Sequence, residues 1–176
     1  MNIKEELLKE HSKINTMRIV NYVGDDKMYF KELMTLFLNG EYRITQRAAW
    51  AISFCAISHP ELVKPYFKKI LTKLNEPNIH DAVKRNVVKI FSEIELPEEF
   101  MGEIYETCFK YLRSMDENIA VKAHSMAVLE KICHQFPELK FELISTIEDM
   151  IPFGSAGIIA RAKITLKKLK RIKSVS

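Results

Sequence analysis

Glycine and proline are scarce in this chain, which holds five and six of them among 176 residues. A sheet of many short strands needs frequent turns, so this scarcity favours long helices. No apolar run approaches the roughly 20 residues that a membrane-spanning helix needs. The first residues, Met1 to Glu6, lack the apolar core of a signal peptide. We therefore expect neither a membrane span nor secretion, and we expect a cytoplasmic protein.

Cysteine is also scarce, and the three cysteines cannot all pair with one another. Cys55, Cys108 and Cys133 each sit inside an apolar pattern with helical spacing. The sequence therefore predicts free, buried thiols in a reducing compartment rather than a disulfide framework.

A short segment with a basic residue near its start occurs four times along the chain. Its copies are Thr45–Ile52, Val83–Ile90, Ala120–Ala127 and Ile159–Leu166. Aligning the basic residues Arg47, Arg85, Lys122 and Arg161 gives intervals of 38, 37 and 39 residues. A near-constant period of this length is typical of stacked supersecondary repeats.

Proline followed by glutamate provides a second, independent landmark. These pairs stand at Pro60, Pro97 and Pro137, at intervals of 37 and 40 residues. Proline suits the first position of a helix, and an acid beside it suits the positive helix end. Two landmarks with one period predict repeated pairs of helices, each interrupted by a proline.

Capping residues and stop signals suggest where the helices begin and end. The expected N-caps are Ser12, Asp25 or Asp26, Asn78, Asp116 and Ser155, with stops at Gly24 and at Asn39–Gly40. Pro65 leaves the second helix of one pair open, starting either at Pro60 with a kink or near Lys64. The last helix is expected to reach about Lys173. The predicted units span residues 12–40, 41–76, 77–115 and 116–153, with a half unit at 154–173.

This pattern resembles the HEAT or armadillo-like family of helical repeats, over about residues 12 to 173. The resemblance implies an all-α fold, a right-handed α-α superhelix or HEAT-like solenoid of about four helix pairs plus a terminal helix, forming a single domain over residues 1–176. It also implies a concave surface lined mainly by the second helices, which binds an extended partner, usually a protein. The aligned basic residues Arg47, Arg85, Lys122 and Arg161 would then be structural.

Positive charge is concentrated at the C-terminal end of the chain. The net charge is +4, yet residues 161–176 hold seven basic residues and no acidic one. A second basic strip lies on one second helix. Together they give the candidate partner-binding residues Lys64, Lys68, Lys73, Lys167, Lys168, Lys170 and Arg171. Solvated helix faces would show the same pattern, and the sequence does not separate the two interpretations.

The patterns that could indicate catalysis or metal binding are weak. Glu130 and His134 share a helix face but supply two ligands where zinc needs three or four. Ser125 beside His124 lacks a glycine elbow and a third group, and Gly154–Gly157 lacks the lysine of a phosphate loop. Trp50, the only tryptophan, is expected to pack between helices. We therefore predict no catalytic residue, no cofactor and no metal.

The sequence thus favours a non-catalytic repeat scaffold that binds a protein partner on its concave face. The alternative is a nucleic-acid-binding protein that resembles the alkylation-repeat DNA glycosylases, which are built from the same helical pairs. Seven cations could neutralise several phosphates. The partner's identity and the oligomeric state stay open.

Overall fold

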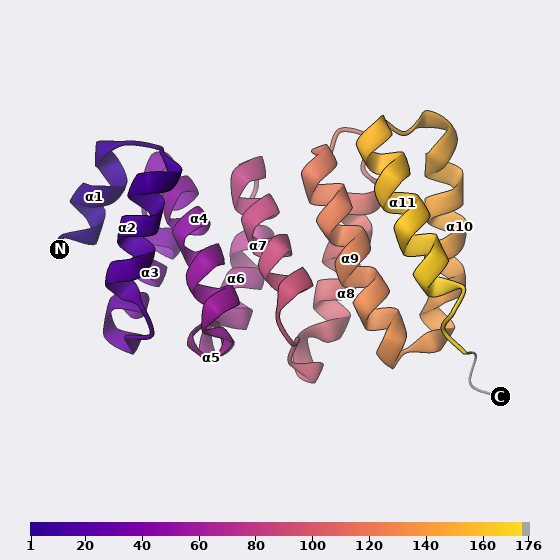
Figure 1. The fold of residues 1–176 in the computed structure, drawn as a ribbon, viewed down its shortest axis with the longest axis horizontal. Coiled ribbons are helices and arrows are strands. Elements are labelled where there is room, and N and C mark those ends of the chain that lie inside the picture. Colours follow the sequence, from indigo (N-terminus) through magenta and orange to yellow (C-terminus); the bar gives the residue numbers. More distant parts are fainter. Residues whose placement is uncertain (174–176) are drawn as a thin grey trace. The chain divides into compact units, whose positions relative to one another are not determined.

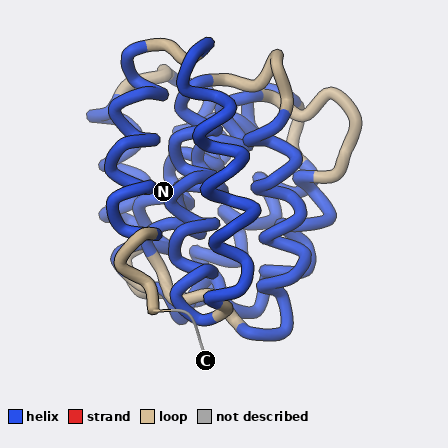
Figure 2. The backbone as a smooth tube through the Cα atoms, turned by 90° about the vertical axis from the view of Figure 1, so that its right-hand side faces the viewer, coloured by secondary structure: helices blue, strands red, loops and turns tan. Residues whose placement is uncertain are grey.

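The computed structural model describes residues 1–173. Over this range all regular structure is helical and no strand occurs, which confirms the expected all-α class (Figures 1 and 2). None of the helices described there is long and apolar enough to cross a membrane. The expected domain also included residues 174–176, which lie outside the described residues. The chain divides into two compact units, Met1–Pro97 and Glu98–Ser176. Its partition into four and a half repeats stays a prediction.

The first unit contains helices α1 to α7 and one short 3₁₀ segment, η1. Their bounds are α1 (Ile3–Lys9), α2 (Lys13–Val23), α3 (Lys27–Asn39), α4 (Tyr42–Ser58), α5 (Pro60–Val63), η1 (Lys64–Tyr66), α6 (Phe67–Leu74) and α7 (Asp81–Glu93).

Local capping explains where the first helices begin and end. The Ser12 hydroxyl accepts a hydrogen bond from the Asn15 amide at 3.0 Å, and the Asp26 carboxylate accepts one from the Met28 amide at 2.7 Å. Gly24 ends α2 with a φ of 51°, a left-handed conformation that glycine adopts without strain. These caps and this stop are confirmed.

Pro65 divides the second helix of the next pair. The chain turns helical at Pro60, passes through η1 and resumes as α6 at Phe67. Because proline has no amide hydrogen and its ring clashes with the preceding turn, a continuous α-helix through Pro65 is unfavourable. Both open alternatives were therefore partly right, since helix starts at Pro60 and starts again after Pro65.

The core of the first unit forms around α4, which packs against α2, α3 and α7. Ala48 and Ala51 are fully buried, and their small side chains let neighbouring helices approach closely. Phe67 of α6 and Phe91 of α7 are both buried, and their rings stack with centroids 5.6 Å apart. Burial of aromatic side chains of this size is a large contribution to stability.

The expected cap of α7 was wrong. His80, not Asn78, is the N-cap, because its Nδ1 accepts a hydrogen bond from the Ala82 amide at 3.0 Å. Asn78 instead takes a φ of 59°, a left-handed conformation that asparagine tolerates in turns.

The second unit contains helices α8 to α11 and three short 3₁₀ segments. Their bounds are η2 (Glu98–Phe100), α8 (Met101–Arg113), α9 (Ile119–Gln135), η3 (Pro137–Leu139), α10 (Lys140–Met150), η4 (Ile151–Phe153) and α11 (Ala156–Leu169). α9 packs against α8 and α11, and α10 packs against α9 and α11 (Figure 1).

Two helix ends in this unit differ from expectation. Asn118, rather than Asp116, caps α9 and accepts a hydrogen bond from the Ala120 amide at 2.9 Å. α11 begins after the expected cap Ser155 but ends at Leu169, short of Lys173. Its last turn tightens through a hydrogen bond from the Ile172 amide to the Leu169 carbonyl at 3.1 Å. The buried Lys140 amine also donates to the Ile172 carbonyl at 2.6 Å.

Candidate functional site

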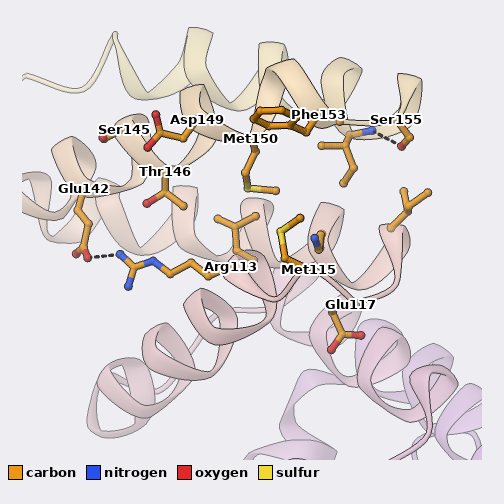
Figure 3. Close-up of a pocket in the computed structure, with 15 residues that line it drawn as sticks. Arg113, Met115, Glu117, Glu142, Ser145, Thr146, Asp149, Met150, Phe153 and Ser155 are labelled. Atoms are coloured by element: carbon orange, nitrogen blue, oxygen red, sulfur yellow. Dashed lines mark hydrogen bonds and ion pairs between the residues drawn. The ribbon is translucent and has the colours of Figure 1, made fainter.

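A groove with a volume of about 690 Å³ opens within the second unit (Figure 3). It runs along α10 and is bounded by the end of α8 and by the beginnings of α9 and α11. Since all four helices belong to the same compact unit, their packing defines its walls. This volume is within the range of protein ligand sites, and it would hold several large side chains of a partner.

One face of α10 supplies the longest wall of the groove. The lining residues on this side recur every three or four positions, the spacing that places side chains on one helix face. They are Glu142, Ser145, Thr146, Asp149, Met150 and, in η4, Phe153. Along this wall the side chains change from acidic and hydroxylic to apolar.

The opposite wall comes from the end of α8 and the start of α9. Met115, in the turn between them, points across the groove toward Met150 (Figure 3). Ile119 and Lys122 of α9 complete this side, and Ile158 of α11 closes the apolar end. Methionine is unbranched and polarisable, so a methionine-lined surface adapts its shape to different partners.

An ion pair closes the polar end. Arg113 of α8 lies 2.6 Å from Glu142 of α10 (Figure 3), and its guanidinium stands 4.7 Å from the centre of the Phe109 ring. The Tyr105 hydroxyl donates to the same glutamate at 3.3 Å. Burial, with the nearby Glu142 charge, raises the pKa of Tyr105, so this donor stays protonated. Arg113 and Glu142 thus pair with each other at the polar end of the groove.

The apolar end is unusually exposed to water. Phe153 is 87% exposed, Met115 is 86% exposed and Ile119 is 51% exposed. Single exposed apolar residues are ordinary, but several gathered around one hollow mark an interaction surface. This clustering makes the groove the candidate functional site.

The C-terminal basic residues lie outside this groove. Lys167 and Arg171 are exposed, whereas Lys168 lies 3.1 Å from Glu130 and Lys170 lies 3.5 Å from Glu148. Two of the four candidate cations therefore already have acidic partners within the second unit.

The basic strip of the first unit likewise contains both exposed lysines and a lysine that already has partners. Lys64 and Lys68 are exposed. Lys73 has a side chain only 11% exposed and lies 2.8 Å from Glu76, and it donates to the Leu38 carbonyl at 3.1 Å. Lys73 therefore links α6 to the end of α3 and is poorly placed to contact a partner.

Two of the four aligned basic residues reach other helices. The Arg47 guanidinium donates to the Leu7 carbonyl at 2.6 Å, and Arg161 lies 3.5 Å from Glu130 of α9. Arg85 is exposed, and Lys122 lines the groove. A structural role for all four stays a prediction.

A family model for the HEAT repeat domain matches residues 3–169. The chain belongs to the HEAT repeat family. The searches of curated proteins and of solved structures found no significant match. HEAT repeats form helical scaffolds that commonly bind proteins and are typically not enzymes.

The weaker sequence motifs have ordinary structural partners in this HEAT domain. Glu130 interacts with Arg161, Lys168 and His134, the last at 3.7 Å. Trp50 packs edge-on against His11 with ring centroids 5.3 Å apart. Among residues 1–173, no group of three or more histidine, cysteine or acidic side chains could hold a metal ion.

The three cysteines are free and buried. Burial raises the pKa of the Cys55, Cys108 and Cys133 thiols to about 12 in each case. A thiolate is the reactive form of cysteine, so none of these thiols is suited to nucleophilic chemistry.

The amino-acid sequence of the HEAT domain does not predict this groove. Met115 and Phe153 stand in connections between helices, where periodicity gives no information about burial. The one available signal was a large apolar residue placed in a turn, outside any helical pattern.

Proposed function

We propose that this HEAT domain is a non-catalytic scaffold that holds a segment of a protein partner in the groove of the second unit. The observation that carries the proposal is the exposed apolar cluster of Phe153, Met115 and Ile119 around a hollow of about 690 Å³. Burying such side chains against a partner is favourable by roughly 25 cal/mol per Å² of apolar surface. The family's common use as protein-binding scaffolds supports the same conclusion.

Second helices contribute part of the lining of the groove, which supports the proposal. Two of its walls come from α8 and α10, which the repeat pattern assigns as second helices. Second helices are those expected to line the partner-binding surface. The three free, buried cysteines support a reducing compartment such as the cytoplasm.

Selection from a displayed library of random short peptides tests this function. The affinity of an enriched peptide is then measured for the full chain, for Phe153→Ser and for Phe141→Ser. Phe141 is the matched control, because it is 62% exposed on α10 and does not line the groove. Loss of a central aromatic anchor is expected to weaken binding about tenfold or more, with little change in the control. Failure to enrich any peptide, or equal losses in the two variants, would contradict the proposal.

Nucleic-acid binding through α11 is the second candidate function. Lys167 and Arg171 are exposed, and residues 161–173 hold no acidic side chain. Against it, Glu130 and Glu148 already neutralise two of the nearby cations. The groove, whose lining combines exposed apolar residues with charged and hydroxyl groups, favours a protein partner.

A further inference from the structure

We infer that the bound segment carries one large apolar side chain and, about one helical turn away, a lysine or arginine that pairs with Asp149. This inference rests on the proposed function, and it adds the chemistry of the partner. The groove residues that could meet a charged partner are Arg113, Glu117, Lys122, Glu142 and Asp149.

Three of these five charged residues already have partners. Arg113 and Glu142 pair with each other at 2.6 Å. Glu117 accepts a hydrogen bond from the Asn118 amide at 3.0 Å and has further interactions. Lys122 is half-buried on the α9 wall.

Asp149 differs from the other acids of the groove. Its side chain is exposed and lines the groove beside Met150 (Figure 3). Within the part of the chain that the structure describes, no ion pair or hydrogen bond of its carboxylate occurs. An exposed carboxylate without a partner attracts a cation from a binding partner and repels a partner's carboxylate.

The distance between anchor and cation follows from α10 and η4. Asp149 lies in α10 and Phe153 lies four residues further on in η4, which at 1.5 to 2.0 Å per helical residue is about 6 to 8 Å along the wall. A partner helix spans this distance with positions i and i+4, and an extended segment spans it with positions i and i+2. The bound segment should therefore pair an apolar anchor with a basic residue at one of these two separations.

The order of the groove also sets the order of the contacts. Phe153, Met115 and Ile119 surround the apolar end, and Asp149 stands between them and the Arg113–Glu142 pair. The anchor of the partner therefore belongs among the apolar residues, and its cation belongs on the side of α10 that faces Glu142. A segment with an acid in place of the cation meets the exposed Asp149 carboxylate, and its binding should be weaker.

The test uses the peptide enriched on the full chain and a second peptide with alanine in place of its basic residue. Their affinities are measured at physiological ionic strength for the wild type, Asp149→Asn and Glu148→Gln. Glu148 is the matched control, because it is the neighbouring acid on α10 and lies 3.5 Å from Lys170 rather than on the groove. Asp149→Asn should weaken binding of the basic peptide about twofold to fivefold and leave binding of the alanine peptide unchanged.

Reversal of the charge at position 149 gives a second test. It predicts a gain of affinity, which a variant that fails to fold cannot produce. A peptide with glutamate in place of its basic residue should bind Asp149→Lys more tightly than it binds the wild type. If enriched peptides depend on Phe153 but lack a basic residue, or ignore Asp149, the inference is overturned and the proposed function stands. If no enriched peptide depends on Phe153, the proposed function itself fails. Selective binding of duplex DNA in place of peptides overturns both.

Discussion

Arg47 illustrates how a single aligned residue stabilises the first unit. Its guanidinium crosses from α4 to the Leu7 carbonyl of α1 at 2.6 Å. A charged donor on a carbonyl at a helix end contributes more than an ordinary neutral hydrogen bond. Arg47→Met keeps most of the aliphatic stem but removes the donor. We expect the free energy of unfolding to fall by about 1 to 3 kcal/mol.

Urea unfolding followed by circular dichroism measures this loss. Arg43→Met is the matched control, because Arg43 is one turn earlier on α4 and is exposed. Its replacement should change stability by less than about 0.5 kcal/mol. Equal losses in the two variants would show that the contact with Leu7 is not the cause.

Glu6 should make the stability of the first unit depend on pH. Its side chain is 4% exposed and lies 2.5 Å from Lys9 and 3.0 Å from Arg18. The hydrogen bond from Lys9 lowers the pKa of Glu6 below its ordinary value of 4.5, and Arg18 lowers it further against the opposing effect of burial. A carboxyl whose pKa is lower in the folded state stabilises the fold above its ordinary pKa, and this contribution disappears as the pH falls through the lowered value.

Comparison of wild type with Glu6→Gln measures this contribution. The wild type should lose more stability than the variant between neutral pH and pH about 3. Glu5→Gln, at an exposed position on the same helix, should follow the wild-type profile. Identical profiles for wild type and Glu6→Gln would contradict the assignment.

At the scale of helices, two glycines should respond to alanine in opposite ways. A methyl group on Gly40 would clash with the Leu36 carbonyl and stand 2.8 Å from Ile44 Cγ2. The φ of Gly40 is −73°, so the obstacle is lack of space between α3 and α4. Gly102 of α8 has nothing within 4 Å of such a methyl group.

We therefore expect Gly40→Ala to destabilise the protein by about 1 to 3 kcal/mol and Gly102→Ala to leave it unchanged or stabilise it by up to about 1 kcal/mol. Thermal unfolding of both variants beside the wild type gives the comparison. A tolerated alanine at position 40 would mean that the turn between α3 and α4 is looser than the structure shows.

Helix existence could be predicted from the sequence, but several helix ends could not. Ser12 and Ser155 cap the helices that follow them. These two caps could be predicted because a single hydroxyl precedes each apolar pattern. At α7 and α9 several polar residues compete for the cap position. His80 caps α7 and Asn118 caps α9, in place of the expected Asn78 and Asp116. The local sequence does not decide between candidate caps that are two residues apart.

At the scale of the whole molecule, the charge distribution bears on the choice of partner. Residues 161–173 hold seven basic side chains and no acidic one, but Lys168 and Lys170 have acidic neighbours. We therefore expect binding to duplex DNA that is no tighter than the roughly 10⁻⁴ to 10⁻⁶ M of non-specific contacts at physiological salt.

A titration of duplex DNA at several salt concentrations checks this expectation. The comparison is with the variant that replaces the candidate cations Lys167, Lys168, Lys170 and Arg171 by glutamine. Tight binding that weakens steeply with salt and is lost in this variant would favour the nucleic-acid alternative.

The repeat architecture could be predicted from the sequence, whereas the groove could not. The period that aligns Arg47 with Arg161 can be seen in the sequence, because each repeat must bury the corresponding faces of its helices. The groove depends on how close Met115 comes to Met150, which are in different elements of the second unit. Such proximity is a property of packing, and no local pattern records it.

Methyl NMR of the full chain tests most directly whether the groove is the binding site. The chain has eight methionines, of which Met115 and Met150 line the groove. Met28, 71% exposed in the first unit, is the internal control. When the selected peptide is added, the methyl signals of Met115 and Met150 should shift and that of Met28 should stay in place. Binding that leaves Met115 and Met150 unchanged would contradict the proposed site.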